Sequence, residues 1–535
     1  AREGRARRGG GRARAARTCA MSAASSASSS ASVSADLEHH SLRFFKGVQK
    51  DAAAKYELIS HLGRGAYGEV WAARNAHSRS NPTQKVAIKK ICNAFCQATE
   101  AKRILRELRI LRHLNHSNVV KIREVLRPDS EATFTDIWVV FDFVDLDLRK
   151  LIASPQTISV AHVQWIAHQI LIALQYLHSA HVLHRDLKPA NVLLSEKCEV
   201  KLCDFGLARV VDEKDWKLNE QRERAAPAIA RQASSGNLRP PPPMSRQMTS
   251  HVVTRWYRAP ELILLQPYTA AIDVWSFACI LAELLTMLPE AQVDQRERCA
   301  LFPGRSCLPL SPVEEDSNPE PNLDQLNVIF SVIGTPNGSL GWIELPEMRN
   351  YLRSLSPVPA TPLRDIYPAA PQTAIELLES MLRFEPFERL TVNEALQHRF
   401  FDSMSYRIAS ELAECPVASA TIDFEHAEVT TGAMRKLIVA EIAHYTERTE
   451  AAVRLHGSAD LAHVQRAAPA ATEDTAHSGN HEGDSQNASC DAVSNAGNDS
   501  ATIDIESGAI DDASRPAKKR KRPVEGTTEA PPDTQ

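Results

Sequence analysis

The feature that most constrains this chain is the run His-Arg-Asp-Leu-Lys-Pro-Ala-Asn at residues 184–191, which Asp204-Phe205-Gly206 follows closely. Together the two segments offer the carboxylates of Asp186 and Asp204, the ammonium of Lys188 and the amide of Asn191. Phosphoryl transfer needs an acceptor for the proton of the attacking hydroxyl, a positive charge beside the phosphate and oxygen ligands for magnesium. The segment therefore predicts a phosphoryl-transfer enzyme.

A glycine-rich turn, Gly-Arg-Gly-Ala-Tyr-Gly-Glu-Val at residues 63–70, lies between two runs that read as strands. Three glycines at this spacing could belong to any tight turn. The strand on both sides argues against a dinucleotide-binding fold, in which such a turn opens a helix. Because glycine lets the backbone come close to a ligand, the turn is a candidate cover for phosphates.

A lysine in an apolar strand follows this turn. Lys89 ends the run Val-Ala-Ile-Lys at residues 86–89, and a buried ammonium needs an anion nearby. A helix predicted over 100–114 places leucines and isoleucines on one face and carries Glu107. Glu107 could belong to an ordinary solvated helix face. The order of strand, lysine and helix favours its pairing with Lys89.

These pieces, in this order and together with Ala-Pro-Glu at residues 259–261, resemble a eukaryotic protein kinase over about residues 56–401. The resemblance implies an α+β, bilobal fold with a β-rich small lobe (56–143) and a helical large lobe (144–401). A buried strand ending at Phe141 would lead into a hinge between the lobes. The periodic apolar residues over 160–178 predict a core helix.

The resemblance also implies ATP and Mg²⁺ as cofactors and assigns roles. Asp186 would accept the substrate proton, Lys188 would steady the transferred phosphate, and Lys89 would hold the α- and β-phosphates. Asn191 and Asp204 would hold magnesium. The remaining residues expected around ATP are Leu62, Gly63, Gly65, Gly68, Val70, Ala87, Glu107, Phe141 as gatekeeper, Asp142 and Val144. Two further resemblances are structural: Glu261 with Arg389 would tie down the activation segment, and Asp273 would support the catalytic loop.

The run Thr-Arg-Trp-Tyr-Arg-Ala-Pro-Glu at 254–261 is similar to that of the mitogen-activated protein (MAP) kinases, as is an enlarged, Pro-rich insert over 286–345. The cyclin-dependent kinases are the nearest alternative, but their cyclin-docking signature is absent from 100–114. The MAP kinase resemblance implies protein substrates in which Ser or Thr precedes Pro.

The activation motif departs from the usual Thr-x-Tyr of MAP kinases, because Thr249-Ser250-His251 stands there. This resembles the atypical protist MAP kinases with Thr-Ser-His. Phosphorylated Thr249 would carry nearly two negative charges. By family position it would dock on three arginines. These are Arg106, Arg185 and Arg209. Because Arg106 precedes Glu107, docking would pull Glu107 toward Lys89.

His251 cannot replace a phosphotyrosine, so Arg255 and Arg258 would lack that ligand. A protonated His251 between these arginines would be repelled, and we expect it to be neutral or turned away; an exposed residue without a role is an equal alternative. We predict that Thr249 alone is modified, by autophosphorylation or by an upstream kinase of single specificity.

Four segments lie outside the predicted core. Residues 1–45 are basic and rich in Ser and Ala and read as a disordered tail, as leader sequence ahead of Met21, or as a transit peptide. Residues 212–248 read as a disordered insertion, with a proline run that could also bind an SH3-type domain. Residues 402–450 are expected to pack back on the kinase, and residues 457–535 to be disordered.

The basic cluster at 518–523 is a candidate nuclear import signal that would bind an import receptor, which predicts a cytoplasmic and nuclear protein. A solvated charge run and a contact with nucleic acid or anionic lipid are the alternatives. The net charge of −4 is small and by itself implies no partner, and nucleic acid is not an expected one. No apolar run reaches membrane-spanning length. The ten cysteines lack zinc-like spacing and are expected to be reduced thiols. An inactive scaffold with the same fold is the main competing function; the full set of catalytic residues argues against it.

Overall fold

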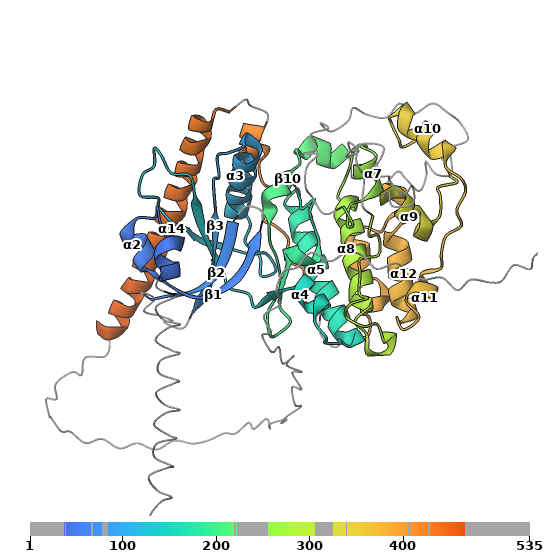
Figure 1. Cartoon of the computed structure of the whole chain (residues 1–535), viewed down its shortest axis with the longest axis horizontal. Coiled ribbons are helices and arrows are strands. Elements are labelled where there is room, and N and C mark those ends of the chain that lie inside the picture. Colours follow the sequence, from blue (N-terminus) through green and yellow to red (C-terminus); the bar gives the residue numbers. More distant parts are fainter. Residues whose placement is uncertain are drawn as a thin grey trace, which may run out of the picture. The chain divides into compact units, whose positions relative to one another are not determined.

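The computed structural model describes residues 37, 39–65, 68–76, 84–218, 221, 255–304, 325–338, 340–404, 407–425 and 429–465, and for 450–465 the backbone alone. These residues form a β-sheet lobe and a helical lobe (Figure 1), as the sequence predicts. Among them, no helix is both long and apolar enough to cross a bilayer.

The small lobe is a five-stranded antiparallel sheet in the order β1-β2-β3-β5-β4. Its strands are β1 (Tyr56–Gly65), β2 (Gly68–Asn75), β3 (Lys85–Ile91), β4 (Ile122–Val125) and β5 (Ile137–Asp142). Helix α3 (Ala98–His113) buries the apolar stripe that its sequence predicts, and Glu107 is buried on it as well. This burial sets the helix beside the strand that carries Lys89.

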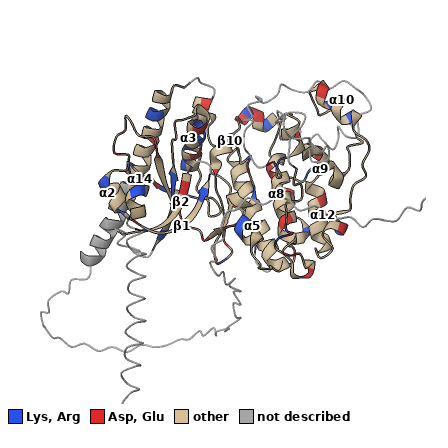
Figure 2. Cartoon of the chain, viewed as in Figure 1, with Lys and Arg blue, Asp and Glu red and all other residues tan. Residues whose placement is uncertain are grey.

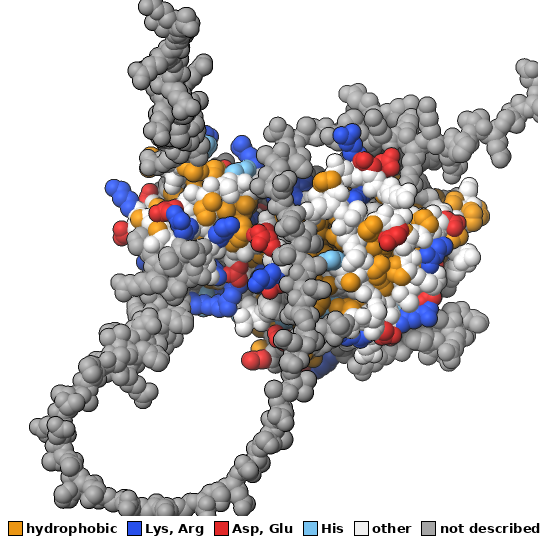
Figure 3. Space-filling model, turned by 90° about the horizontal axis from the view of Figure 1, so that it is seen from below, with side chains coloured by type: hydrophobic (Ala, Val, Ile, Leu, Met, Phe, Trp, Pro, Cys, Tyr) orange, Lys and Arg blue, Asp and Glu red, His pale blue; other side chains and the backbone are white. Residues whose placement is uncertain are grey.

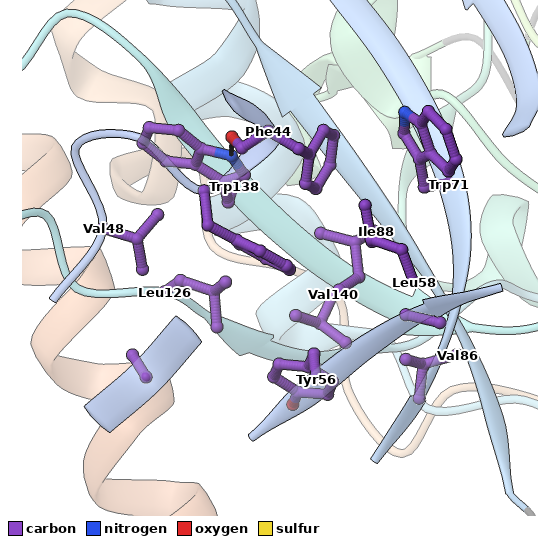
Figure 4. Packing of buried hydrophobic residues seen from close by; sticks show 13 residues of the cluster. Phe44, Val48, Tyr56, Leu58, Trp71, Val86, Ile88, Leu126, Trp138 and Val140 are labelled. Carbon is purple, nitrogen blue, oxygen red and sulfur yellow. Dashed lines mark hydrogen bonds between the residues drawn. The ribbon is translucent and has the colours of Figure 1, made fainter. Parts of the chain in front are cut away.

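The N-terminal residues cover part of this sheet. Phe44 and Phe45, just before α2 (Lys50–Ala54), are buried in a cluster with Trp71 and Trp138 (Figure 4). The indole Nε1 of Trp138 donates a hydrogen bond to the carbonyl oxygen of Phe44 at 2.9 Å. The predicted disordered segment over 1–45 thus extends too far by several residues. The prediction followed the Ser- and Ala-rich composition and overlooked Phe44 and Phe45, which pack against Trp71 and Trp138.

The large lobe is built around two buried helices, α5 (Val160–Ser179) and α8 (Ala271–Leu285), and every residue of α8 is buried. Around them lie α4 (Leu148–Ala153), α7 (Pro260–Ile263), α9 (Gln325–Ile333), α10 (Pro346–Ser354), α11 (Leu363–Ile366), α12 (Gln372–Met381) and α13 (Val392–Leu396). Short strands carry the catalytic segments: β6 (Leu146–Asp147), β7 (Val182–Leu183), β8 (Val192–Leu194), β9 (Val200–Leu202) and β10 (Arg209–Val210). A helix hydrophobic on all sides forms a rigid core to which these strands can be anchored.

After the large lobe the chain returns to the small lobe. The 3₁₀ segment η7 (Ser419–Glu425) contacts α3, and α14 (Thr431–Gln465) contacts α3 and β4. The backbone of α14 continues past residue 457, where the sequence predicted a disordered tail to begin. The hydroxyl of Tyr445, at the packed part of α14, donates to the carbonyl oxygen of Leu108 at 2.8 Å.

Candidate active site

One buried carboxylate of the large lobe holds the backbone of the catalytic loop in place. Asp273, on α8, is fully buried and accepts hydrogen bonds from the backbone N–H groups of His184 and Arg185, both at 2.9 Å. Its other partner is His178 Nε2 at 3.1 Å. Burial alone would raise the pKa of Asp273, but His178, the nearby His184 and the backbone N–H of Arg185 lower it below its usual value. The ionised carboxylate holds Arg185 at a φ of 65°, a conformation that costs energy for a residue with a Cβ.

This anchor presents the three predicted catalytic residues together. Lys188 Nζ lies 2.7 Å from Asp186 Oδ2, and Asn191 Nδ2 donates to the same oxygen at 3.1 Å and to the Asp186 carbonyl at 2.8 Å. Burial raises the pKa of Asp186 above its ordinary value, although Lys188 opposes the shift. A carboxylate with a raised pKa is a better proton acceptor near neutral pH.

Asp204 and Asn191 have the chemistry that a magnesium ion prefers. Both offer oxygen ligands, and because Asn191 contacts Asp186 through Nδ2, its Oδ1 can bind a cation. Burial would raise the pKa of Asp204, but Lys89 and Lys188 outweigh burial and lower it, so its carboxylate is ionised. The residues present therefore fit the implied Mg²⁺.

The lysine of β3 and the acid of α3 are paired, as the sequence predicts. Lys89 Nζ lies 3.0 Å and 3.2 Å from the two carboxylate oxygens of Glu107. Burial disfavours the charge on Lys89, yet Glu107 and Asp204 outweigh it and raise the pKa of Lys89. The lysine is thus a fixed positive charge that can face phosphate.

The predicted ATP-contacting residues of the sheet lie on or directly after four adjacent strands. Leu62, Gly63 and Gly65 belong to β1, Gly68 and Val70 to β2, and Ala87 to β3; Phe141 and Asp142 end β5, and Val144 follows them. The sheet register sets Val70 opposite Lys89 and Ala87 opposite Phe141. These residues therefore share one part of the sheet.

The glycines of the turn differ in their surroundings. A Cβ at Gly63 or Gly65 would meet no atom of the described residues within 4 Å, so these residues leave the backbone of the two glycines open to a ligand. Gly68 is held at a φ of 154°, and a Cβ there would lie 1.8 Å from the carbonyl oxygen of Lys90. Gly68 is consequently required by the backbone itself.

The end of the activation segment is tied to the large lobe by a buried ion pair. Arg389 Nη1 and Nη2 lie 2.6 Å and 2.7 Å from the carboxylate oxygens of Glu261, and both side chains are fully buried. Nearby, Trp256 Nε1 donates to the carbonyl oxygen of Gly304 in the insert at 2.9 Å. The pair predicted from the sequence is therefore present.

Two of the three arginines expected to receive phosphothreonine share one tyrosine. Arg209 Nη1 donates to the Tyr268 hydroxyl at 2.9 Å, and the Arg185 guanidinium lies 5.2 Å from the centre of the Tyr268 ring. Burial lowers the pKa of Arg185, and the nearby charges of Arg209 and Arg106 lower it further. The three arginines thus form one electropositive cluster.

Arg106 has a partner that the sequence reasoning missed. Its Nε donates to Glu425 Oε1 and its Nη1 donates to the carbonyl oxygen of Gly206. The run Ile-Asp-Phe-Glu at 422–425 was the available signal, because an acid beside a buried aromatic can be fixed in place. Arg258 lines a small pocket with Asp186, while Thr249 and His251 lie outside the described residues.

This bilobal fold, with an assembled catalytic loop and a paired Lys89, defines the class of eukaryotic protein kinases. The protein kinase domain family model matches residues 56–401. The chain is 38% identical over 393 residues to mitogen-activated protein kinase 6 of Arabidopsis thaliana, covering 73% of this chain and 83% of that protein. It is 38% identical over 395 residues to the homologue NTF6 of Nicotiana tabacum, covering 73% and 89% respectively.

A third relative, mitogen-activated protein kinase 3 of Oryza sativa subsp. japonica, is 40% identical over 352 residues, which are 65% of this chain and 79% of that protein. The chain belongs to the MAP kinase family of serine/threonine protein kinases.

Proposed function

We propose that this MAP kinase transfers the γ-phosphate of Mg-ATP to Ser or Thr residues that precede Pro, and that phosphorylation of Thr249 alone raises its activity. The observation that carries the catalytic part is the simultaneous presence of the Lys89–Glu107 pair and the Asp186–Lys188–Asn191 group. A scaffold without turnover would not need both.

Bound Mg-ATP would supply the phosphoryl group and neutralise the charge that develops on it. The protein contributes position and charge. Glu107 holds Lys89 in position for the phosphates. Asp204 and Asn191 would provide oxygen ligands for magnesium, and Lys188 lies beside Asp186. Asp186 accepts the proton of the substrate hydroxyl. Positioning and electrostatic stabilisation account for most of the rate enhancement in such a site.

The proposed preference for Pro after the acceptor residue comes from membership of the MAP kinase family. Regulation through Thr249 is supported by the electropositive cluster of Arg106, Arg185 and Arg209, which could bind a dianionic phosphate. With His251 in place of tyrosine, Arg255 and Arg258 receive no second phosphate. A single-specificity kinase or autophosphorylation would therefore be sufficient.

Protein substrates, an upstream kinase and, through residues 518–523, a nuclear import receptor are the proposed partners. We propose that the protein occupies cytoplasm and nucleus. Nucleic acid is not an expected partner. On the face seen in Figure 3, basic and acidic side chains of the described residues are interspersed, which gives a weaker attraction to phosphate backbones than a continuous basic surface.

Phosphate transfer from Mg-ATP to a Ser-Pro peptide and to its Ser-Ala twin tests the proposal. Wild type, Asp186→Asn and Thr249→Ala are compared, with Thr249 occupancy measured by mass spectrometry. We expect transfer to Ser-Pro only, a loss of about 10²- to 10⁴-fold in Asp186→Asn because the proton acceptor is removed, and weak activity in Thr249→Ala. Equal rates for wild type and Thr249→Ala would refute the regulatory part. Absence of transfer in every form, even after treatment with upstream kinases, would favour the scaffold.

A further inference from the structure

The side chain of Arg106 connects three parts of the molecule. It projects from α3 one residue before Glu107, and it donates to Glu425 of the C-terminal extension and to the carbonyl oxygen of Gly206. The Arg106 and Glu425 side chains are only 13% and 16% exposed. Solvent therefore screens this ion pair less than a pair on the open surface.

Glu425 is held in place by its neighbours. Lys102 Nζ donates to the Glu425 backbone carbonyl at 2.9 Å. The preceding residue, Phe424, is buried, and the Arg109 guanidinium lies 5.1 Å from the centre of its ring. The carboxylate is thus fixed by packing on α3 and does not depend on a freely rotating loop.

The surroundings of Glu425 are those expected for an anion. Arg106 and Arg209 both lower the pKa of Arg185 by repulsion, whereas the Glu425 carboxylate opposes that effect. Arg185 and Arg209 share Tyr268, and Arg106 is close enough to Arg185 to repel it, so three guanidinium groups lie in one region. A carboxylate at this point reduces the mutual repulsion of the arginines.

The active arrangement of α3 is present together with this contact. Glu107 faces Lys89 at 3.0 Å while Arg106 is bound by Glu425. Adjacent residues of a helix move together, so a force that fixes Arg106 also restrains Glu107. The contact with the Gly206 carbonyl links the same arginine to the residues after Asp204.

We propose that Glu425 is a positioning residue that takes, on Arg106, the place proposed above for the phosphate of Thr249. Its carboxylate holds α3 with Glu107 toward Lys89 before the activation segment is phosphorylated, and so supports basal activity. The proposal rests on the proposed function only in its assignment of Arg106 to phosphothreonine.

Charge determines when Glu425 matters most. A carboxylate carries one negative charge, whereas a phosphothreonine carries nearly two and offers three oxygens. Once Thr249 is phosphorylated, the phosphate supplies the stronger ligand for Arg106, and the helix no longer depends on Glu425. The contribution of Glu425 should therefore be large in the unphosphorylated enzyme and small in the phosphorylated one.

The test compares Glu425→Gln with Glu414→Gln, a matched loss of charge at an exposed position of the same extension. Each is made in wild type, phosphorylated at Thr249 and verified by mass spectrometry, and in a Thr249→Ala background. In that background we expect Glu425→Gln to lower kcat by about three- to tenfold, with KM for the peptide unchanged, since a partly shielded charge-assisted hydrogen bond is lost. In the phosphorylated enzyme the loss should be less than about twofold.

Glu425→Asp, which keeps the charge, should recover part of kcat, and Glu414→Gln should change nothing in either background. Thermal unfolding of all variants identifies any that fail to fold, and Glu425→Asp keeps the test informative in that case. An equal loss of kcat with and without phosphate would overturn the proposal in favour of general packing. A gain of activity in Glu425→Gln would also overturn the proposal, because Glu425 would then block Arg106. Unchanged kcat in Glu425→Gln, with and without phosphate, would overturn it as well.

The result is separable from the proposal about Thr249. If phosphorylated wild type is no more active than Thr249→Ala, regulation through Thr249 fails. The effect of Glu425→Gln in the Thr249→Ala background still reports on the positioning of α3, because no phosphate is present there.

Discussion

The two lobes hold their functional elements by different means. In the large lobe, Glu261, Arg389 and Asp273 are almost completely buried, and each carboxylate is satisfied by several donors. In the small lobe, α3 is held by pairs with more access to solvent: Lys89 is 29% exposed beside Glu107, and Asp423 is 72% exposed beside Arg109. Figure 2 shows the basic residues of α3 close to the acidic residues of the extension.

This difference indicates which part of the molecule is fixed and which part can be adjusted. A buried, fully bonded charge is costly to leave without its partner, so the catalytic loop and the end of the activation segment have one arrangement. Partly exposed pairs, such as those that hold α3, contribute less than fully buried ones and can be exchanged at a lower cost. The helix that carries Glu107 is therefore the element on which a phosphate or a carboxylate can act.

The strongest test of the comparison is Arg389→Met. It leaves the buried Glu261 carboxylate without its bidentate partner, and we expect the free energy of unfolding to fall by about 3–5 kcal/mol. Denaturant unfolding measures the loss. The double variant Glu261→Leu/Arg389→Met should regain part of it, since no unpaired charge remains. A loss below about 1 kcal/mol in the single variant would show that the buried Glu261–Arg389 pair stabilises the protein no more than the ion pairs of the small lobe do.

A smaller effect concerns Glu283 on α8, whose carboxylate accepts from the Tyr257 hydroxyl at 2.7 Å. Burial raises its pKa from 4.5 to about 7, although Tyr257 opposes the shift. The folded state therefore binds this proton more tightly. The contribution of protonated Glu283 to the free energy of unfolding is complete below pH 4.5 and is lost as the pH rises to about 7.

Glu283→Gln removes this dependence, since the amide oxygen can still accept from Tyr257. Relative to the variant, wild type should lose roughly 3 kcal/mol of unfolding free energy between pH 4.5 and 7.5. Unfolding curves at several pH values for both proteins check this. Glu385, whose pKa burial also raises to about 7, is present in both and cancels in the difference. Parallel curves would show that Glu283 is ionised in the folded protein.

The smallest effects are expected along α3. Glu441, on α14, is 4% exposed and accepts from Arg109 Nε at 3.1 Å and Arg112 Nη1 at 3.0 Å. Glu441→Gln should lower the unfolding free energy by about 1–2 kcal/mol, because two arginines lose a shielded anion. Asp423→Asn, the exposed partner of Arg109, should cost less than about 0.5 kcal/mol and less still at high salt. Equal costs for the two variants would contradict the role given to burial.

The sequence determined the class of fold and most of the active site. The glycine loop, Lys89, Asp186 and Asp204 could be recognised from the sequence, because the chemistry of phosphate and magnesium requires these residue types in short, recognisable motifs. The pairing of Lys89 with Glu107 could also be predicted, since a lysine in a buried strand needs an anion and the next helix offers one.

The tertiary structure decided which charges meet across long separations. Nothing in the spacing of Arg106 and Glu425, more than three hundred residues apart, indicates their contact, and the burial of Phe44 against Trp138 depends on the chain folding back over the sheet. The sequence pattern of the C-terminal extension has no periodicity from which the partners of its polar residues could be predicted. Which carboxylate is buried, and therefore which arginine it holds, follows only from how the lobes and the extension pack.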